Sequence, residues 1–223
     1  MFSGYDRMAE VIVVTGTATE VGKTWVTAHV LRRLSESGVP VTVRKPVQSF
    51  DIAGGPTDAD VLAGALGIEP HEVCPLHRWY ELPMAPPMAA EARGLPPLAL
   101  PDLVAEMALP ELGLALVEGV GGPRSPLTDD ADTVDLAEAL DARLVVLVAD
   151  AGLGSINATV LSLAALERWE TIIFVNRFEP GNDLHERNVR WLREAEGLDP
   201  ITDIKQLATK ISHLAHKEGT LNK

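Results

Sequence analysis

The sequence predicts an α/β protein built around a mostly parallel sheet. Several short runs are apolar at nearly every position and rich in valine, which is typical of strands buried on both faces. These runs cover residues 11–15, 41–45, 114–118, 144–149 and 171–176. Helical stretches separate them, and an alternation of strand and helix along the chain predicts a parallel sheet covered by helices.

The helices are predicted from apolar periodicity and from end signals. The clearest covers residues 23–37, because Gly38 follows it as a C-terminal cap. Others are expected at 133–140, 155–168 and 182–195, with a weaker amphipathic stretch at 204–214. No internal repeat and no linker divides the chain, so we expect a single domain over residues 1–223, with residues 1–8 flexible.

A proline-rich segment interrupts the alternation. Residues 80–101 carry six prolines, which disfavours a long regular helix there. Such a segment usually forms a packed loop near the edge of the sheet or over a site. We therefore expect it to lie beside the functional residues or at the sheet edge.

Composition excludes several classes of protein. The 223 residues suffice for one sizeable core, with 46% hydrophobic but only 4% aromatic residues. The net charge is −13 and no basic stripe is present, which argues against a nucleic-acid partner. No run reaches the length of a membrane span, and the single cysteine suits a reducing cytoplasm, where we expect the protein.

The segment that follows the first predicted strand has the composition of a phosphate-binding loop. Residues 16–24 read GTATEVGKT, between a strand and a helix, which is the setting of a Walker A loop. Backbone N–H groups around Glu20, Val21 and Gly22 would face phosphate oxygens at the helix N-terminus. Lys23 would reach the β- and γ-phosphates, and Thr24 would offer its hydroxyl to Mg²⁺. The simpler alternative is a glycine-containing turn with an exposed lysine.

The spacing in this loop departs from the usual pattern. Five residues separate Gly16 from Gly22, where the common Walker A loop has four. The loop resembles that of dethiobiotin synthetase, and four further segments are similar to that family in the same order. They are KPVQS at 45–49, MAP at 84–86, VEGVGG at 117–122 and GLGSIN at 152–157. The resemblance covers roughly residues 11–180 and implies a three-layer P-loop NTPase fold.

The resemblance also implies a reaction. The substrate would be 7,8-diaminopelargonic acid, one amine of which combines with CO₂ or bicarbonate to give a carbamate. ATP with Mg²⁺ would phosphorylate the carbamate, and the second amine would close a ureido ring and release phosphate. Family members are homodimers with the substrate site at the subunit interface.

Two charged residues at strand ends carry the expected chemistry. By resemblance, Lys45 neutralises the carbamate and the migrating phosphoryl group, an electrostatic role. Ser49 adds a hydroxyl to the same anion. Glu118 ends a very apolar strand, where carboxylates face the ligand crevice of α/β proteins, and is expected to hold Mg²⁺ and nucleotide. The alternatives are that Lys45 is a solvent-exposed lysine, that Ser49 is a polar turn residue, and that the charge of Glu118 only ends its strand.

The sequence does not decide which of two aspartates, Asp58 or Asp60, is the third metal ligand. The family match favours Asp60, directly before an apolar helix, with Asp58 as the alternative. Thr57 followed three residues later by Asp60 also reads as a helix capping box, which would engage the Asp60 carboxylate structurally.

Most of the remaining assignments come from the resemblance. Thr19 contacts the carbamate and Glu20 lies near the nucleotide; the alternative is that both are polar loop residues that face water. Gly154, Ser155, Ile156 and Asn157 open a helix whose free N–H groups bind the substrate carboxylate of the partner subunit; the alternative is an ordinary serine N-cap. The position of Asn176 at the end of the last strong strand, and not the resemblance, suggests that its amide reads adenine; the alternative is a turn-favouring residue.

The C-terminal segment, residues 198–223, diverges from the family. Its usual Gly-x-x-Pro segment, which helps to enclose adenine, is absent, so the base preference stays open with ATP as the default. Two other functions also stay open. One is a P-loop ligase for another small acid, and the other is a switch ATPase of the partitioning or metal-insertion class.

Overall fold

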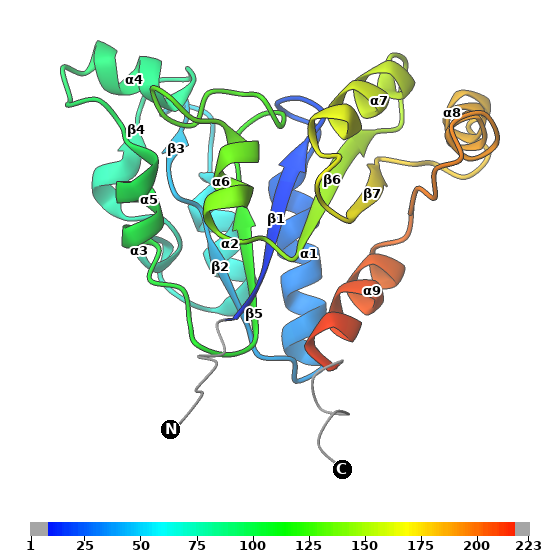
Figure 1. Cartoon of the computed structure of the whole chain (residues 1–223), viewed down its shortest axis with the longest axis horizontal. Helices are drawn as coiled ribbons and strands as arrows, with labels where there is room; N and C mark the ends of the chain where they lie inside the picture. Colours follow the sequence, from blue (N-terminus) through cyan, green and yellow to red (C-terminus); the bar gives the residue numbers. More distant parts are fainter. Residues whose placement is uncertain (1–8, 217–223) are drawn as a thin grey trace.

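The computed structural model describes residues 9–216, and its centre is a five-stranded sheet with the strand order β2-β5-β1-β6-β7 (Figure 1). In strand order these are β2 (Val41–Arg44), β5 (Leu114–Glu118), β1 (Glu10–Gly16), β6 (Leu144–Asp150) and β7 (Thr171–Asn176). All four pairings are parallel. The α/β class and the parallel sheet are confirmed. The expected flexibility of residues 1–8 lies outside the described residues.

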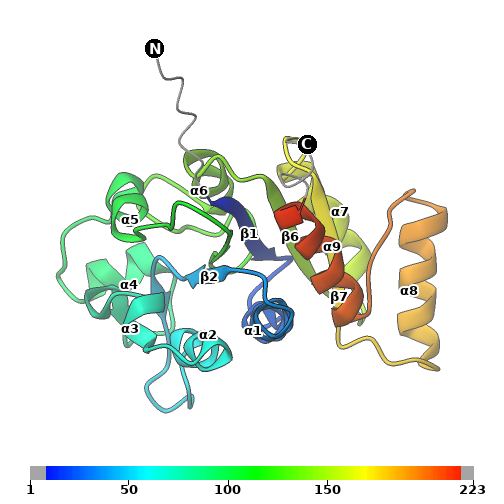
Figure 2. The same ribbon diagram turned by 90° about the horizontal axis from the view of Figure 1, so that it is seen from below.

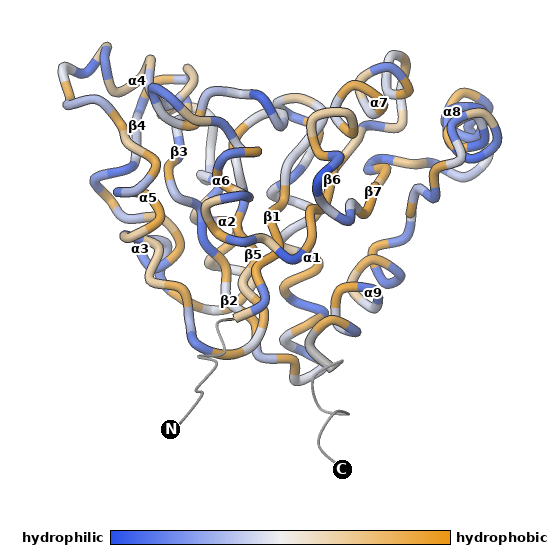
Figure 3. Tube along the Cα trace, in the orientation of Figure 1, coloured by the Kyte–Doolittle hydropathy of each residue, from blue (hydrophilic) through white to orange (hydrophobic). Residues whose placement is uncertain are grey.

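Alternate residues of the three central strands, β5, β1 and β6, enter two separate hydrophobic cores. In β1, Ile12 and Val14 belong to one core, whereas Val11 and Val13 belong to the other. Since both faces are covered, the strands read as continuous apolar runs, as expected from the sequence. The hydropathy colouring places hydrophobic residues along the central strands (Figure 3).

Helices cover both faces and complete three layers (Figure 2). On one face, residues of α1 (Lys23–Glu36), α2 (Asp58–Leu66) and α9 (Ile204–His216) share a core with the sheet. On the other face lie the short helices α4 (Pro86–Ala92), α5 (Leu100–Glu106) and α6 (Thr133–Ala139). At the β7 edge, α7 (Ser155–Ala165) and α8 (Asp183–Glu194) follow β6 and β7 along the chain. A third small core joins β7 to Val189 of α8.

The proline-rich segment contains a short helix where we expected a packed loop. Pro86 and Pro87 occupy the first positions of α4, where proline is tolerated because those N–H groups have no partner within the helix. The helix ends after seven residues, so the exclusion of a long helix is confirmed. Before it, β3 (Gln48–Ser49) pairs with β4 (Trp79–Tyr80), and α3 (Pro70–Val73) and a 3₁₀ turn (Leu76–Arg78) lie between them.

Most predicted elements differ from the structure by a few residues at one or both ends, and two of the differences are instructive. The helix expected at 155–168 ends at Ala165, because the chain then turns through the bonds Leu166 N–H to Leu163 O and Trp169 N–H to Leu166 O. The strand expected at 41–45 ends at Arg44, which leaves Lys45 just beyond it. Boundaries of this kind depend on where the chain must turn, and apolar pattern alone does not specify that.

The C-terminal segment extends the edge of the sheet. Ile201 forms a parallel bridge with Phe174 of β7, with backbone bonds from Val175 N–H to Ile201 O (2.8 Å) and from Ile201 N–H to Ile173 O (2.9 Å). The chain then enters α9, whose Leu207, Ala208 and Ile211 are buried. The amphipathic stretch at 204–214 is therefore confirmed as a helix. No helix within residues 9–216 is long and apolar enough to cross a bilayer.

Candidate nucleotide and metal site

The phosphate loop lies at the carboxyl end of the sheet, between β1 and α1 (Figure 1). Gly22 precedes α1 with a φ of 88°, in the left-handed region that glycine adopts most easily. A Cβ there would lie 2.3 Å from the Asn176 side-chain nitrogen, which itself donates to Val21 O at 2.9 Å. The loop is thus fixed against β7, with its backbone turned toward the helix N-terminus.

A second loop runs beside the phosphate loop. Gly16 N–H donates to Gly121 O at 3.2 Å, and Gly119 N–H donates to Val14 O at 3.0 Å. The VEGVGG segment and the phosphate loop, about a hundred residues apart in the sequence, therefore share one end of the sheet, as expected where parallel strands end. A Cβ on Gly121 would lie 3.7 Å from the Thr19 methyl, so Thr19 borders the same region.

A cluster of four polar side chains lies under the start of α1. The Thr24 hydroxyl lies 2.8 Å from Asp58 Oδ1 and 2.8 Å from Glu118 Oε1. Lys45 Nζ lies 2.7 Å from Asp58 Oδ2 and 2.9 Å from Glu118 Oε1. Lys45 also donates to Gly119 O at 3.2 Å. Lys45 and Glu118 are buried, whereas the Asp58 side chain is 44% exposed, so the cluster opens to solvent on the Asp58 side.

The pKa values of the two buried lysines are shifted in opposite directions. Desolvation, together with the nearby charge of Lys45, lowers the pKa of Lys23 to about 8, against the opposing effect of Glu118 and Asp58. Burial also acts to lower the pKa of Lys45, but the Asp58 and Glu118 carboxylates outweigh it and the pKa is raised. Burial acts to raise the pKa of Asp58, and contact with Lys45 overcomes this and lowers it. Lys45 and Asp58 therefore stay ionised as a pair.

The donor set fits Mg²⁺. This ion takes oxygen ligands and is usually held by one or two carboxylates together with phosphate oxygens and water. Thr24, Asp58 and Glu118 supply one hydroxyl and two carboxylates beside the phosphate loop. Among residues 9–216 no group of three or more His, Cys, Asp or Glu side chains could hold a metal. A metal here would thus depend on nucleotide and water for its remaining ligands.

The structure reverses the preference between the two aspartates. Asp60 Oδ2 accepts from Thr57 N–H and from the Thr57 hydroxyl, both at 2.8 Å, and the Thr57 hydroxyl accepts from Asp60 N–H. This is the capping box of α2, so the Asp60 carboxylate serves the helix end. Asp58 faces Thr24 and Lys45 instead. The sequence favoured Asp60 over Asp58 as the third metal ligand, but of the two aspartates it is Asp58 that lies beside Thr24 and Lys45.

A cavity of about 510 Å³ adjoins the phosphate loop at the β7 edge. Its walls include Trp25 from α1, Phe178, and Thr202 and Asp203 before α9. Asn176 and Gly22 also line it, so the cavity is continuous with the loop. Its size and its aromatic walls are typical of a small-ligand pocket.

Comparison with known proteins identifies the family. A family model described as an AAA domain matches residues 10–208. The ATP-dependent dethiobiotin synthetase of Rhodococcus jostii (strain RHA1) is 45% identical over 159 residues, which cover 70% of this chain and 67% of that protein. The enzyme of the same name from Anaeromyxobacter dehalogenans (strain 2CP-C) is 42% identical over 160 residues, covering 70% of each. The chain belongs to the dethiobiotin synthetase family.

Solved structures share the fold beyond this family. A plasmid partition protein from Borrelia burgdorferi superposes with a TM-score of 0.53 at 11% identity, over 95% of this chain and 99% of that one. A signal recognition particle receptor from Elizabethkingia anophelis in complex with GDP gives 0.52 at 14% identity, over 90% of this chain and 58% of that one. The P-loop NTPase fold extends to both, and at such identities the likeness concerns the fold alone.

The site residues predicted from the sequence do not all lie together. Thr24, Lys45, Asp58 and Glu118 converge through the contacts described above, and Lys23, which precedes Thr24, donates to Ala18 O of the phosphate loop at 3.3 Å. Ser49 lies on β3 and donates to Met84 O, which ties it to the proline-rich segment. Gly154, Ser155, Ile156 and Asn157 open α7, where Gly154 has a φ of 88° and Ser155 Oγ is buried without a hydrogen-bond partner in residues 9–216.

Sequence reasoning missed three residues that position the site. Gln48 is buried and accepts from Ala59 N–H at 2.9 Å, which fixes the start of α2 and so directs Asp58. Arg177 donates to Glu20 O at 2.7 Å and to Asp150 Oδ2 at 2.9 Å, linking the phosphate loop to the end of β6. Thr27 donates toward Glu118. The available signals were the position of Gln48 after KPV and of Thr27 one helical turn after Lys23.

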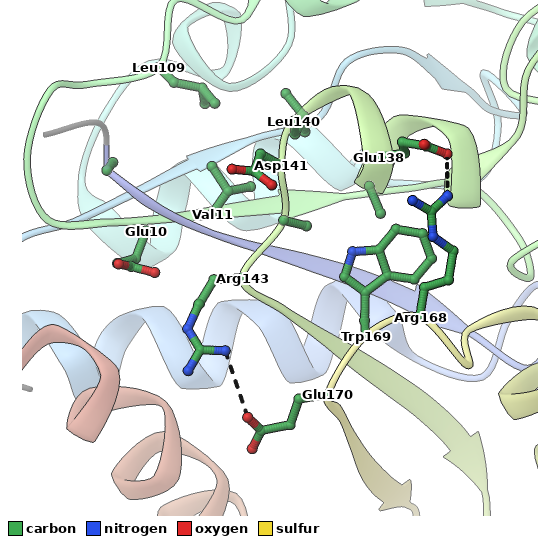
Figure 4. Close-up of a pocket in the computed structure, with 13 residues that line it drawn as sticks. Glu10, Val11, Leu109, Glu138, Leu140, Asp141, Arg143, Arg168, Trp169 and Glu170 are labelled. Atoms are coloured by element: carbon green, nitrogen blue, oxygen red, sulfur yellow. Dashed lines mark hydrogen bonds and ion pairs between the residues drawn. The ribbon is translucent and has the colours of Figure 1, made fainter. Parts of the chain in front are cut away.

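A further cavity lies at the other end of the sheet. It measures about 620 Å³ and is lined by residues at the amino ends of β1, β6 and β7 (Figure 4). Its two arginines are paired, Arg168 with Glu138 at 2.7 Å and Arg143 with Glu170 at 3.8 Å. The phosphate loop and the Lys45 cluster lie at the opposite end of the strands, so this cavity is separate from the candidate site.

Proposed function

We propose that the protein is an ATP-dependent dethiobiotin synthetase, which converts 7,8-diaminopelargonic acid, CO₂ and ATP into dethiobiotin, ADP and phosphate. The observation that carries the proposal is the buried Lys45 beside Glu118 and the phosphate loop. Nucleotide binding alone does not need this second lysine, because Lys23 already serves the phosphates. A second cation at this position suits a reaction in which a substrate carbamate and a phosphoryl group come together.

The reaction divides into steps that this chain's residues can support. One substrate amine adds to CO₂ and loses a proton, giving a carbamate. The carbamate oxygen attacks the γ-phosphorus of ATP, and the bond to the β-phosphate oxygen breaks. The second amine then attacks the carbamoyl carbon, phosphate leaves, and the ureido ring closes. Lys45 and Lys23 would offset the negative charge of both anions throughout, and Thr19 would contact the carbamate.

We assign the Mg²⁺ ligands to Thr24, Asp58 and Glu118. When bound, the ion would neutralise phosphate charge and orient the γ-phosphate for transfer. Thr24 stands directly after Lys23, so one turn of α1 would serve both metal and phosphate. Asp58 replaces Asp60 in this assignment, because the Asp60 carboxylate is occupied by the α2 cap.

The nucleotide base is proposed to bind in the cavity beside Asn176. Trp25 and Phe178 provide apolar walls for a ring, and Asn176 provides an amide that both donates and accepts. Glu20 would border the nucleotide. Adenine is the default base. We also propose a cytoplasmic location, because the single cysteine, Cys74, is buried and free.

The substrate carboxylate is proposed to bind at residues 154–157 of a second subunit. The start of α7 presents backbone N–H groups, and Leu153 and Leu161 beside it are 92% and 65% exposed. Large exposed apolar side chains of this kind favour an interface. Light scattering of the wild type should report a dimer. Leu153→Asp should weaken it, whereas Leu112→Asp, an exposed leucine before β5, should not.

Phosphate release tests the function directly. Mg·ATP and bicarbonate are supplied with and without 7,8-diaminopelargonic acid, and dethiobiotin is followed by mass in the same sample. We expect release that depends on the diamine and matches dethiobiotin one for one. Release without the diamine would favour the switch ATPase instead. Diamine-dependent release with no dethiobiotin would point to another ligase.

A further inference from the structure

The two carboxylate oxygens of Glu118 contact different partners. Oε1 faces the functional cluster, with Thr24 at 2.8 Å and Lys45 at 2.9 Å. Oε2 faces α1, where the Thr27 hydroxyl lies 2.9 Å away. Within the described part of the chain, residues 9–216, this hydroxyl is the only hydrogen-bond donor to Oε2. Glu118 has no exposed surface and Thr27 is 1% exposed, so solvent does not replace that donor.

The Thr27 hydroxyl has a choice of two acceptors. Lys23 O also lies 2.9 Å away, one helical turn earlier. A hydroxyl has a single proton to donate. A carboxylate is the stronger acceptor, and a buried carboxylate oxygen without a donor would be costly. The Lys23 carbonyl is already within the helix hydrogen-bond pattern. The geometry therefore favours donation to Glu118.

We infer that Thr27 is a positioning residue that restricts Glu118 to a single oxygen toward the metal. This inference rests on the proposed Mg²⁺ site and goes beyond it, because the Thr27 hydroxyl bonds to Oε2 and not to the proposed ligand oxygen Oε1. With Oε2 held by a hydroxyl, Glu118 presents Oε1 alone. One-oxygen ligation suits Mg²⁺, whose octahedral shell is small, whereas Ca²⁺ readily takes carboxylates through both oxygens.

The placement follows from the helix and the strand. Thr24 and Thr27 are three residues apart on α1, so their side chains share a face of the helix. That face lies against the end of β5, where Glu118 is the last residue. One helix thus contacts both oxygens of the same carboxylate. An outer-shell partner of a metal ligand typically matters for affinity, by roughly 10- to 100-fold on removal.

Metal affinity in three variants tests the inference. Thr27→Val keeps the shape and removes the hydroxyl, Thr27→Ser keeps the hydroxyl, and Thr159→Val removes another buried helical hydroxyl, which has no hydrogen-bond partner in residues 9–216. Competition of Mg²⁺ and Ca²⁺ against Mn²⁺, detected by electron paramagnetic resonance with a non-hydrolysable ATP analogue, gives both affinities. Thermal melting checks folding.

The expected result is specific to the hydroxyl and to the ion. Thr27→Val should weaken Mg²⁺ binding by about tenfold, with a smaller loss for Ca²⁺, and Thr27→Ser and Thr159→Val should stay near the wild type. Equal Mg²⁺ affinity in Thr27→Val and the wild type would overturn the inference. So would an equal loss in Thr27→Val and Thr27→Ser, or an equal loss for both ions. Dethiobiotin formation by the wild type is measured separately, so failure of the proposed function is distinguishable.

Discussion

Asp58 and Asp60 show how two similar residues acquire different tasks. They are two positions apart at the start of α2, and a helix turns by about 200° over two residues, so their side chains diverge. Asp60 completes the capping box with Thr57, and Asp58 points to Lys45 and Thr24. Substitution of each should therefore affect a different measurement.

We expect Asp58→Asn to raise the Mg²⁺ concentration needed for half-maximal activity by roughly tenfold or more, since even an outer-shell partner is worth about that much. Asp60→Ala should instead lower the free energy of unfolding by about 1 kcal/mol through loss of the cap, with little change in Mg²⁺ requirement. Metal titration and urea unfolding of both variants provide the check. The reverse pattern would return the ligand role to Asp60.

Lys45 is the counter-charge of two carboxylates. Lys45→Met should abolish most dethiobiotin formation. It should also leave Asp58 and Glu118 facing each other without a cation, which destabilises the protein in the absence of metal. We therefore expect added Mg²⁺ to raise the melting temperature of Lys45→Met more than that of the wild type. Identical shifts in the two proteins would contradict this electrostatic account.

At the scale of elements, the phosphate loop depends on its contact with the end of β7. Asn176 donates to Val21 O, and Arg177 donates to Glu20 O. The loop conformation is thus set partly by a strand about 155 residues away in sequence. Gly22 is required at this contact on two grounds, its positive φ and the closeness of the Asn176 amide.

Gly22→Ala should strongly reduce nucleotide binding, because the new methyl would lie 2.3 Å from the Asn176 nitrogen and the left-handed backbone would be strained. The matched control is Gly64→Ala in α2, where a Cβ meets nothing within 4 Å. That change should stabilise the protein by about 0.5–1 kcal/mol through helix propensity, and leave binding intact. Calorimetry with an ATP analogue compares them, and normal binding by Gly22→Ala would refute the argument.

At the scale of the whole molecule, ion pairs join segments that are distant in sequence. Arg78, in the turn before β4, makes two bonds to Glu106 of α5, at 2.8 and 2.7 Å. These bonds lower the pKa of Glu106 below its ordinary value of 4.5, against a smaller opposing effect of burial. The pair stabilises the segments that cover the β2 edge of the sheet, where residues of α3 and α5 line a common cavity.

Stability should depend on pH through this pair. Because the pKa of Glu106 is lower in the folded state, its contribution is fully present above pH 4.5 and is lost as the pH falls through the folded-state pKa. The difference in melting temperature between the wild type and Glu106→Gln should therefore be largest near neutral pH and shrink under acid. Glu138→Gln, at an exposed pair, should have little effect. A constant difference for Glu106→Gln would count against the pair.

The sequence by itself determined the fold class, the five strands of the central sheet, several of the helices between them, and the phosphate loop. Continuous apolar runs indicate strands buried on both faces, and glycine, lysine and threonine between a strand and a helix indicate a phosphate site. Both features can be recognised in the sequence because each depends only on neighbouring residues. The KPV and VEGVGG segments are recognisable from their resemblance to the family. Lys45 and Glu118 are therefore identifiable from the amino-acid sequence alone.

Only the tertiary structure decided which side chains meet. Asp58 lies beside Lys45, Thr27 beside Glu118, and Asn176 beside Val21, and each pair joins residues that are distant in the sequence. The sequence left Asp58 and Asp60 open because both are compatible with a helix start, and no local pattern connects Thr27 with a carboxylate 91 residues away. Such pairings follow from the packing of α1 and α2 on the carboxyl ends of the strands. Two side chains can form a hydrogen bond or ion pair only when the packing of the whole core has brought their backbones close together.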